Sequence, residues 1–362
     1  MANVLDHRAQ SAQAFSDFEG QTALLDRLAR DFQVGQFAHA YLFLGPDGVG
    51  KFSVALLCAM AAVCRHGGAA QSARQDTLLA GLDGAETDKP QGKVPCGACG
   101  PCVRVRSRTH PDVQIIEIGK SMGVDAMREL LAQVQVRPFE GGAKVVVLRG
   151  ADRMTMQAQN CLLKTLEEPP ADTCFILTAK TQSALLSTIL SRCRILRFHP
   201  LSEEAAEKRL LALGVEPGRA GLLSHQSEGR VGAALEMAKD EQYFTLLTRV
   251  DQTLFSLRAD SDIPAASAAF RDEKDSAERI LHIAEQLFRD AMRLQLMGES
   301  RVELGYSRDF ALYVQRADAS ASVRMLRVIQ EALRMRASNV PFLSIWEKIL
   351  LTIAEEHRKW QW

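Results

Sequence analysis

Residues 21–200 alternate between short apolar runs and amphipathic segments with helical spacing. The apolar runs are rich in Val, Ile, Leu and Phe, as buried strands are, and they lie at residues 40–44, 113–118, 144–148, 174–178 and 195–198. The segments with helical spacing lie at residues 21–35, 52–63, 124–136 and 155–167. Such alternation predicts an α/β domain in which helices flank a parallel sheet.

Beyond residue 200 the strand-type runs give way to helical patterns. Short helices are expected at 201–240, and from about residue 244 apolar residues recur at steps of three and four. These stripes comprise Ile280, Ala284, Leu287, Ala291 and Leu294, then Leu326, Ile329 and Leu333, then Ile345, Ile349 and Ile353. The pattern predicts an all-helical bundle whose stripes form its own core, some of them being available to seal contacts between subunits.

A phosphate-binding loop joins the first apolar run to the next helix. Gly45, Gly48, Gly50 and Lys51 fit the pattern Gly-x-x-x-x-Gly-Lys, in which backbone N–H groups converge on phosphate oxygens at a helix N-terminus. Lys51 would add a point charge on the outer phosphates. The alternative, a chance glycine loop, is disfavoured by the strand before the loop and the helix after it.

The groups that a nucleotide hydrolase uses to hold magnesium are missing. Phe52 stands where a Ser or Thr hydroxyl would bind the metal, and Ser53 is rotated about 100° around the helix from that position. Arg149 and Gly150 follow the next buried strand, where an acidic pair would be expected. Asp152 lies beyond the strand end and is more simply a turn residue. We therefore expect a loop that retains groups for binding ATP or ADP without hydrolysing it.

Three cysteines with metal-ligand spacing follow an insertion at residues 67–95. Cys96, Cys99 and Cys102 are separated by two residues each, and Cys64 before the insertion would complete a closed four-sulfur site. Structural Zn²⁺ is the favoured metal, an iron–sulfur cluster is the alternative, and His66 and His110 are spare candidates for the fourth ligand. A catalytic zinc would need an open position and a nearby base, which nothing here suggests. Cys58 lies within an apolar helix and is assigned to the core.

Composition narrows the choice of partners. Lys plus Arg equal Asp plus Glu at 44 each, so the formal net charge is zero and no overall attraction to nucleic acid or membrane is expected. No stretch is apolar for long enough to span a bilayer. We therefore expect a cytoplasmic protein without membrane contact, whose eight cysteines are metal ligands and buried thiols.

Four motifs occur in the order found in clamp-loader subunits of bacterial DNA polymerase III. They are residues 39–43, the cysteine cluster, residues 160–170 and residues 189–193. The chain resembles the delta-prime subunits of that family most closely. The resemblance implies an AAA+ module with a zinc-binding insertion at 1–199, a small helical lid at 200–243 and a helical collar for oligomerisation at 244–362.

The resemblance also assigns two residues outside the phosphate loop. Arg192, in Ser191-Arg192-Cys193, matches an arginine finger that reaches a neighbouring subunit's nucleotide; the alternative is a surface or ion-paired arginine. Gly232 falls where an active subunit has its sensor arginine, although Arg230 is only two residues away.

Together these features predict a non-hydrolysing clamp-loader subunit within a hetero-oligomer. The implied partners are gamma/tau ATPase subunits, a delta subunit and, through the complex, the sliding clamp and primer-template DNA. One alternative is a gamma/tau-like ATPase, which would need a hydroxyl at 52 and an acid at 149 or 150. Another is a zinc-ribbon nucleic-acid binder, for which Arg104, Arg106 and Arg108 offer limited positive charge.

Overall fold

The computed structural model describes residues 15, 18, 20–66, 94–140, 142–273, 275–297 and 306–359. Most of the predicted insertion, residues 67–93, lies outside the described residues. The chain divides into two compact units, Met1–Lys239 and Asp240–Trp362. The division into three domains at residues 199 and 243 remains a prediction.

A five-stranded parallel sheet forms the centre of the first unit. Its strand order is β2-β3-β4-β1-β5. The strands are β1 (Ala40–Leu44), β2 (Val113–Glu117), β3 (Lys144–Arg149), β4 (Thr173–Ala179) and β5 (Arg194–Arg197). Every residue of β1 and β4 is buried, because helices cover both faces of the sheet, as is usual for parallel sheets.

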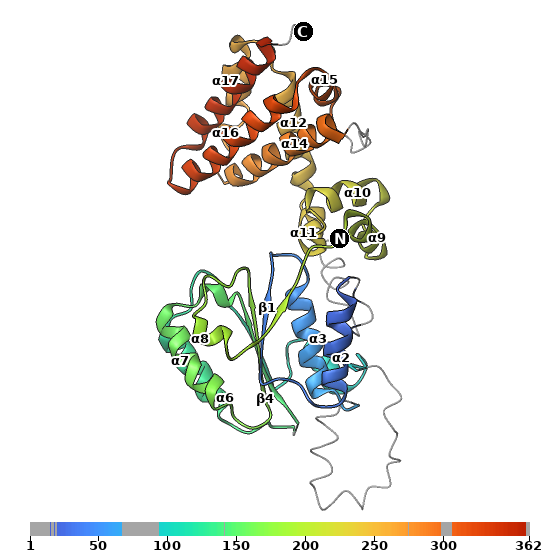
Figure 1. The fold of residues 1–362 in the computed structure, drawn as a ribbon, viewed down its shortest axis with the longest axis vertical. Coiled ribbons are helices and arrows are strands. Elements are labelled where there is room, and N and C mark those ends of the chain that lie inside the picture. The colour runs from blue at the N-terminus through green and yellow to red at the C-terminus, as the bar shows by residue number, and fades with distance from the viewer. Residues whose placement is uncertain are drawn as a thin grey trace, which may run out of the picture. The chain divides into compact units, whose positions relative to one another are not determined.

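The helices separate into two layers (Figure 1). On one face, α2 (Thr22–Gln33) and α3 (Lys51–Val63) share a core with the sheet that includes Phe32, Tyr41 and Phe43. The other face is covered by α6 (Val124–Val134), α7 (Met156–Glu167) and α8 (Ser187–Leu190). The predicted α/β architecture, a parallel sheet with helices on both faces, is therefore confirmed, with the phosphate loop at the carboxyl end of β1.

Three shorter helices complete the first unit. They are α9 (Glu203–Ala212), α10 (Pro217–Gln226) and α11 (Val231–Lys239), and they pack on one another around Ala206, Leu210 and Leu223. Ser202 caps α9, because its hydroxyl accepts the N–H of Ala205 at 3.3 Å. These helices correspond to the small helical region that was predicted at 201–240.

The second unit is a helical bundle. Its helices are α12 (Glu241–Ser256), α13 (Ile263–Ala268), α14 (Ala277–Met297), α15 (Arg308–Arg316), α16 (Ala319–Ala337) and α17 (Phe342–Lys359). The aromatic rings of Phe255, Phe288, Phe310 and Tyr313 meet in its core, with centroids 5.1 to 5.6 Å apart.

The predicted apolar stripes are correct on α17 and on most of α14, but on α16 only for Ile329. Ile345, Ile349 and Ile353 are all fully buried. On α16 the buried apolar residues are Ala321, Met325, Ile329 and Ala332, whereas the predicted Leu326 and Leu333 are only half-buried. A helix places neighbouring residues about 100° apart. On either side of Ile329, the buried residues Met325 and Ala332 each precede the predicted residue by one position.

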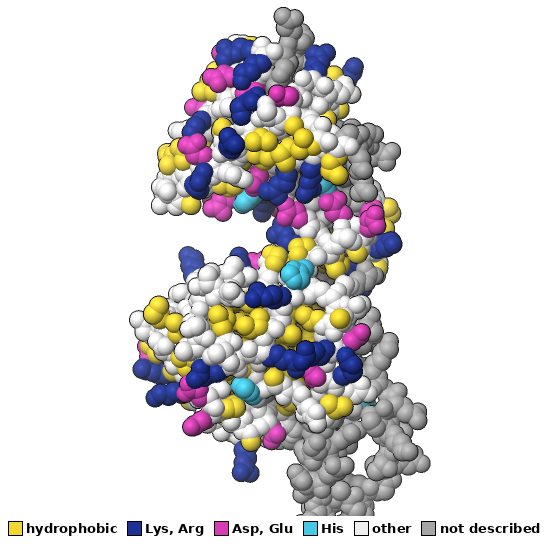
Figure 2. All heavy atoms as spheres, viewed as in Figure 1, with side chains coloured by type: hydrophobic (Ala, Val, Ile, Leu, Met, Phe, Trp, Pro, Cys, Tyr) yellow, Lys and Arg dark blue, Asp and Glu magenta, His cyan; other side chains and the backbone are white. Residues whose placement is uncertain are grey.

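The surface agrees with the neutral composition. On the face seen in Figure 2, acidic and basic side chains are interspersed over both units among neutral and apolar groups. No helix in the described part of the chain combines the length and the hydropathy needed to cross a bilayer.

Candidate functional site

The phosphate loop turns sharply between β1 and α3. Gly45, Gly48 and Gly50 have φ angles of 149°, 84° and 93°, and α3 begins at Lys51 directly after the last of them. The loop therefore has the strand–turn–helix geometry that the sequence predicted, with the N-terminus of α3 directed at the loop.

Lys51 is folded back onto its own loop. Its ammonium group donates to the carbonyl oxygens of Gly45 and Pro46, the latter at 2.7 Å. The side chain is only 8% exposed. Burial lowers the pKa of Lys51, and the negative charges of Asp47 and Asp152 offset part of that shift. The loop carbonyls thus occupy the hydrogen bonds that Lys51 would give to phosphate oxygens.

Asp47, within the loop, lies between two lysines. Its carboxylate is 2.7 Å from Lys180 Nζ and 3.8 Å from Lys51 Nζ. Burial alone would raise the pKa of Asp47, but the hydrogen bond from Lys180 and the charges of both lysines bring it below its usual value. The loop therefore contains a carboxylate of its own, next to both lysines.

Two guanidinium groups lie near the ring of Phe52, which stands where a hydrolase would have a magnesium-binding hydroxyl. The guanidinium of Arg149 lies 4.9 Å from the centre of the Phe52 ring, and that of Arg108 lies 5.5 Å from it. Both arginines also reach Glu117 Oε1, at 3.4 and 3.1 Å respectively. Glu117, the carboxylate at the end of β2, therefore forms ion pairs with two guanidinium groups.

The two other candidate metal ligands, Asp152 and Ser53, both lie near the loop, since the charge of Asp152 acts on Lys51. Asp152 lies in a 3₁₀ turn, η2 (Ala151–Arg153), after the end of β3. Ser53 lines a pocket whose lining includes Gly48, Val49 and Gly50 but not Arg149. Neither residue replaces the hydroxyl and the acidic pair that the sequence lacks.

The N-terminus of α11 packs directly on the phosphate loop. The N–H of Gly232 donates to the carbonyl oxygen of Gly48 at 2.8 Å. A Cβ on Gly232 would lie 2.9 Å from that oxygen, which leaves no room for a side chain. Arg230 is turned away, its Nε donating to Ser227 O at 2.8 Å. The backbone contact between Gly232 and Gly48 therefore lies at the position that the resemblance aligned with the sensor arginine of an active subunit.

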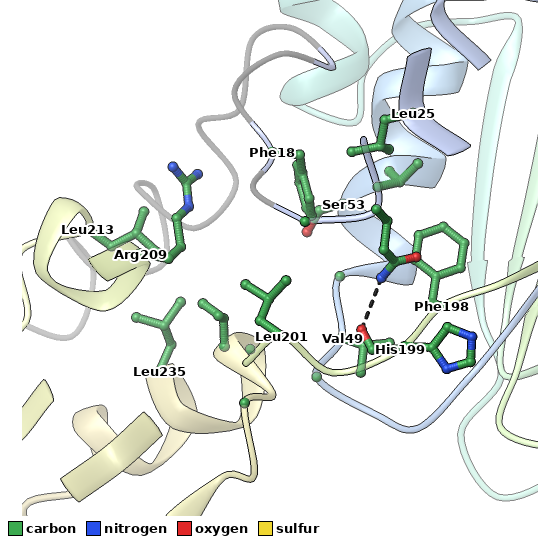
Figure 3. A pocket seen from close by; sticks show the side chains of 18 residues that line it. Phe18, Leu25, Val49, Ser53, Phe198, His199, Leu201, Arg209, Leu213 and Leu235 are labelled. Carbon is green, nitrogen blue, oxygen red and sulfur yellow. Dashed lines mark hydrogen bonds between the residues drawn. The ribbon is translucent and has the colours of Figure 1, made fainter. Parts of the chain in front are cut away.

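A mostly apolar pocket adjoins the loop (Figure 3). Val49, Gly50 and Val54 line it from the loop and the start of α3, and Leu201, Val231 and Leu235 line it from the small helical region. Gln21 closes one side by donating to the carbonyl oxygen of His199 at 3.0 Å. Pockets of this kind, apolar with a few polar groups at the edge, suit small organic ligands.

The structure brings four thiols together. The Sγ atoms of Cys64, Cys96, Cys99 and Cys102 all lie within 4.8 Å of one another. Tetrahedral sulfur ligands of zinc, each about 2.3 Å from the metal, would be about 3.8 Å apart, so the donor set fits a metal ion after a small contraction.

The surroundings of the thiols also favour a metal. The N–H of Cys99 donates to Cys96 Sγ at 3.3 Å. The hydrogen bond from Cys102 lowers the pKa of Cys64 and raises that of Cys102, so this pair favours one thiolate shared with one thiol.

The spare ligands and Cys58 lie outside this cluster. His66 is exposed, and His110 Nδ1 accepts the N–H of Asp112 at 3.1 Å. Neither histidine belongs to the group of thiols. Cys58 is fully buried in α3.

Arg192 lies just after α8, with about one third of its side chain exposed. Its guanidinium contacts Glu167 Oε1 at 2.5 Å and donates to the carbonyl oxygen of Thr188 at 3.0 Å. Arg192 is therefore an ion-paired arginine at the surface of this chain, held by local contacts that a neighbouring subunit could replace.

Several residues around the loop were not identified from the sequence. Lys180 and Glu117 lie at or just beyond the ends of β4 and β2, and the carboxyl ends of parallel strands meet at one edge, so charges at strand ends could have identified them. Asp47 lies within the loop motif itself. Arg108 had no such signal, because its place depends on how the cysteine segment folds.

Comparison with known proteins places the chain among replication proteins. The family model described as "DNA polymerase III, delta subunit" matches residues 20–80 and 82–202. The delta' subunit of Escherichia coli K12 is 31% identical over 273 residues, covering 74% of each chain. The delta' subunit of Bacillus subtilis 168 is 29% identical over 353 residues, covering 93% of this chain and 97% of the relative.

Two further similarities are to a tau subunit and to a gamma subunit-related protein. The tau subunit of Bacillus subtilis 168 is 26% identical over 366 residues, which is 98% of this chain and 60% of that relative. Among solved structures, a gamma subunit-related protein of Thermotoga maritima aligns with a TM-score of 0.49 and 18% identity, covering 94% of this chain and 100% of that one.

Proposed function

The chain belongs to the DNA polymerase III delta-subunit family, and we propose that it acts in the clamp loader as a delta-prime subunit that does not itself hydrolyse ATP. The observation that carries the proposal is the position of Arg149 against Phe52. Magnesium binding in a phosphate loop needs a hydroxyl and nearby carboxylates. Here an aromatic ring and guanidinium groups occupy that region, and the contact of Gly232 with Gly48 supports the same conclusion.

The competing proposal is a gamma/tau-like ATPase. The similarity to a tau subunit over nearly the whole chain favours it. Against it stand Phe52 and Arg149, since a hydrolysing subunit would need to acquire both a hydroxyl and an acid at these places. The local chemistry therefore favours the organising role.

In this role Arg192 would serve a neighbour's nucleotide. A guanidinium remains charged at all physiological pH values and can donate two parallel hydrogen bonds to phosphate oxygens. To reach a neighbour, Arg192 would exchange Glu167 for a phosphate, which is a more highly charged acceptor in the same fork geometry. Its partial exposure makes that exchange accessible.

The four thiols would hold a structural zinc ion. A closed set of four sulfur ligands leaves no position for substrate water, so the metal would fix the cysteine segment against α3 rather than take part in chemistry. An iron–sulfur cluster remains the alternative for the same donors.

The proposed partners are gamma/tau ATPase subunits and a delta subunit within a cytoplasmic hetero-oligomer. The sliding clamp and primer-template DNA would be met through that complex. The neutral charge of the chain supports indirect rather than autonomous DNA binding.

The proposal is tested in a loader reconstituted from gamma/tau, delta and this chain. Arg192→Ala should assemble normally, because a partly exposed ion pair contributes about 1 kcal/mol or less to stability. It should lower DNA- and clamp-stimulated ATP turnover by less than the about 10³–10⁵ of a single finger-dependent site, since other sites and motions also limit the rate. Arg192→Lys should restore little, because an ammonium group lacks the planar fork.

The matched control is Arg128→Ala, which removes a more exposed arginine from α6. It should leave turnover unchanged. Wild-type clamp loading with the Arg192→Ala subunit would make Arg192 a surface arginine only. ATP turnover by the isolated chain that disappears in Lys51→Ala would instead favour the gamma/tau-like reading.

A further inference from the structure

A buried glutamine connects α7 to the segment that carries Arg192. Gln159, near the start of α7, is only 4% exposed. Its Nε2 group donates to the carbonyl oxygens of Met154 and Ala184, at 3.2 and 3.0 Å, and its Oε1 accepts the N–H of Leu186 at 2.9 Å. Two carbonyl acceptors and one N–H donor identify which end of the amide is the nitrogen. The side chain therefore fixes the backbone directly before α8.

The fixed backbone leads directly to Arg192. The carbonyl oxygen of Leu186 accepts the N–H of Ile189 at 3.0 Å, and that of Ile189 accepts the N–H of Arg192 at 3.1 Å. Ile189 is fully buried in the core on the sheet face where α7 and α8 lie (Figure 1). Two hydrogen-bonded steps thus join the residue that Gln159 holds to the arginine. We call residues 186–193 the Arg192 segment.

We propose that Gln159 is a positioning residue for Arg192, which it serves by holding the start of the Arg192 segment against α7. The inference rests on the proposed action of Arg192 on a neighbouring subunit's nucleotide. Because Gln159 is buried, it would affect that nucleotide only through the arginine.

The anchor matters most when Arg192 leaves its local partner. The guanidinium contacts Glu167 Oε1 at 2.5 Å, at the last residue of α7. An exchange of Glu167 for a phosphate would break that contact, and the bonds to Thr188 O and Ser191 Oγ lie within the segment itself. The three hydrogen bonds of Gln159 would persist. A guanidinium on a backbone that is already in place loses less conformational entropy when it binds a phosphate.

The simpler alternative is that Gln159 only satisfies backbone groups. A buried N–H or carbonyl without a partner costs free energy, and this amide supplies partners for three such groups. That role would stabilise the fold whether or not residue 192 is an arginine. Positioning alone makes the effect of a change at Gln159 depend on the presence of Arg192.

The first measurement is hydrogen exchange of the full-length protein. Gln159→Met keeps an unbranched side chain but removes all three hydrogen bonds, so the amides of residues 186–193 should exchange at least about fivefold faster. Gln133→Met is the matched control, because it makes the same change on α6, where the amide bonds Gln114 at an exposed site. It should leave exchange in the Arg192 segment as in the wild type. Thermal unfolding should show that both variants are folded.

The second measurement is a double-mutant cycle in the loader reconstituted from gamma/tau, delta and this chain. Gln159→Met should lower DNA- and clamp-stimulated ATP turnover roughly threefold or more, but by less than Arg192→Ala does. In the Arg192→Ala background the same change should alter turnover by less than about twofold, because no guanidinium remains to be positioned. Gln133→Met should leave turnover unchanged in both backgrounds.

Three results would overturn the inference. They are unchanged exchange of residues 186–193 in Gln159→Met, unchanged turnover with that variant, or an equal fall in turnover with and without Arg192, which would make Gln159 a structural residue only. Failure of the proposed function is recognised separately, because it needs no change at Gln159: the Arg192→Ala subunit would then support wild-type turnover. That result would overturn the inference as well, since no arginine finger would remain for Gln159 to position.

Discussion

The guanidinium of Arg149, at the end of β3, lies 4.9 Å from the ring centre of Phe52, in the first turn of α3. A cation over an aromatic face is attracted by the ring quadrupole, an interaction of about 0.5–1 kcal/mol at an exposed site. Two positions that would cooperate in holding magnesium in a hydrolase thus stabilise each other without metal. Phe52 and Arg149 therefore take part in one interaction, and replacing either residue would remove it.

The isolated protein should show no ATP hydrolysis above background. Phe52→Thr alone should not restore it, because the new hydroxyl would still face Arg149 and would lack an acid to position water. Turnover is measured by phosphate release in excess Mg²⁺. Sustained turnover in the wild type or in Phe52→Thr would show that another group supplies the missing chemistry.

Purified protein should contain one zinc ion, and Cys99→Ser should lose it, because three thiolates hold zinc much less tightly than four. Metal analysis by mass spectrometry measures the stoichiometry. Cys161→Ser is the matched control, since Cys161 on α7 lies outside the cluster. Unchanged zinc in Cys99→Ser, or visible absorption of an iron–sulfur cluster, would contradict the assignment.

Gly232→Ala should destabilise the first unit by about 1–3 kcal/mol, the usual cost of forcing extra volume into a packed contact. The added Cβ would lie 2.9 Å from Gly48 O and 3.0 Å from Gly48 Cα. Unfolding followed by far-ultraviolet circular dichroism gives the free energy. Hydrogen exchange should be faster at the Gly232 amide, which loses its bond to Gly48.

Gly218→Ala provides the matched control in α10. No atom lies within 4 Å of the Cβ that it would add, and alanine is favoured over glycine in a helix by up to about 1 kcal/mol. This variant should be neutral or slightly more stable. Equal effects of the two substitutions would show that the contact between Gly232 and Gly48 is not tight.

The stability of the second unit should depend on pH, because the pKa of Glu356 differs between the folded and the unfolded state. Burial raises the pKa of this carboxyl, but hydrogen bonds from Arg324 and Lys359 and their charges outweigh burial and bring it below the usual value. Because the pKa is lower in the folded state, its stabilisation is present above the unfolded pKa of about 4.3 and is lost as the pH falls through the folded value. Glu356→Gln should therefore cost about 1.5–3 kcal/mol at pH 7 and progressively less as the pH falls below about 4.3.

Urea unfolding followed by tryptophan fluorescence measures this effect, because Trp346 is fully buried in the second unit and residues 1–239 contain no tryptophan. Glu331→Gln is the control. Glu331 also bridges α16 and α17, through Lys348 at 3.0 Å, but it is half exposed and should contribute about 1 kcal/mol or less. A constant difference between wild type and Glu356→Gln from pH 7 to pH 3 would contradict the assigned pKa shift.

The sequence by itself determined the strands, the loop and the cysteine spacing. Each depends on residues that are near one another along the chain: apolar runs predict strands, and Gly45 to Lys51 carries its own turn geometry. The missing hydroxyl at 52 and the missing acid at 149 could likewise be identified by position alone. That Phe52 and Arg149 touch could not, because they are distant in sequence and meet only when β3 is placed in the sheet beside α3.

Tertiary packing decided the remainder. Which face of α16 is buried depended on its neighbours, which selected Met325 and Ala332 over Leu326 and Leu333. The contact between Gly48 and Gly232, and the meeting of Arg108 with Arg149 at Glu117, join segments that no local pattern relates. Local periodicity fixes which residues can form an element, whereas the close packing of several elements fixes which side chains meet.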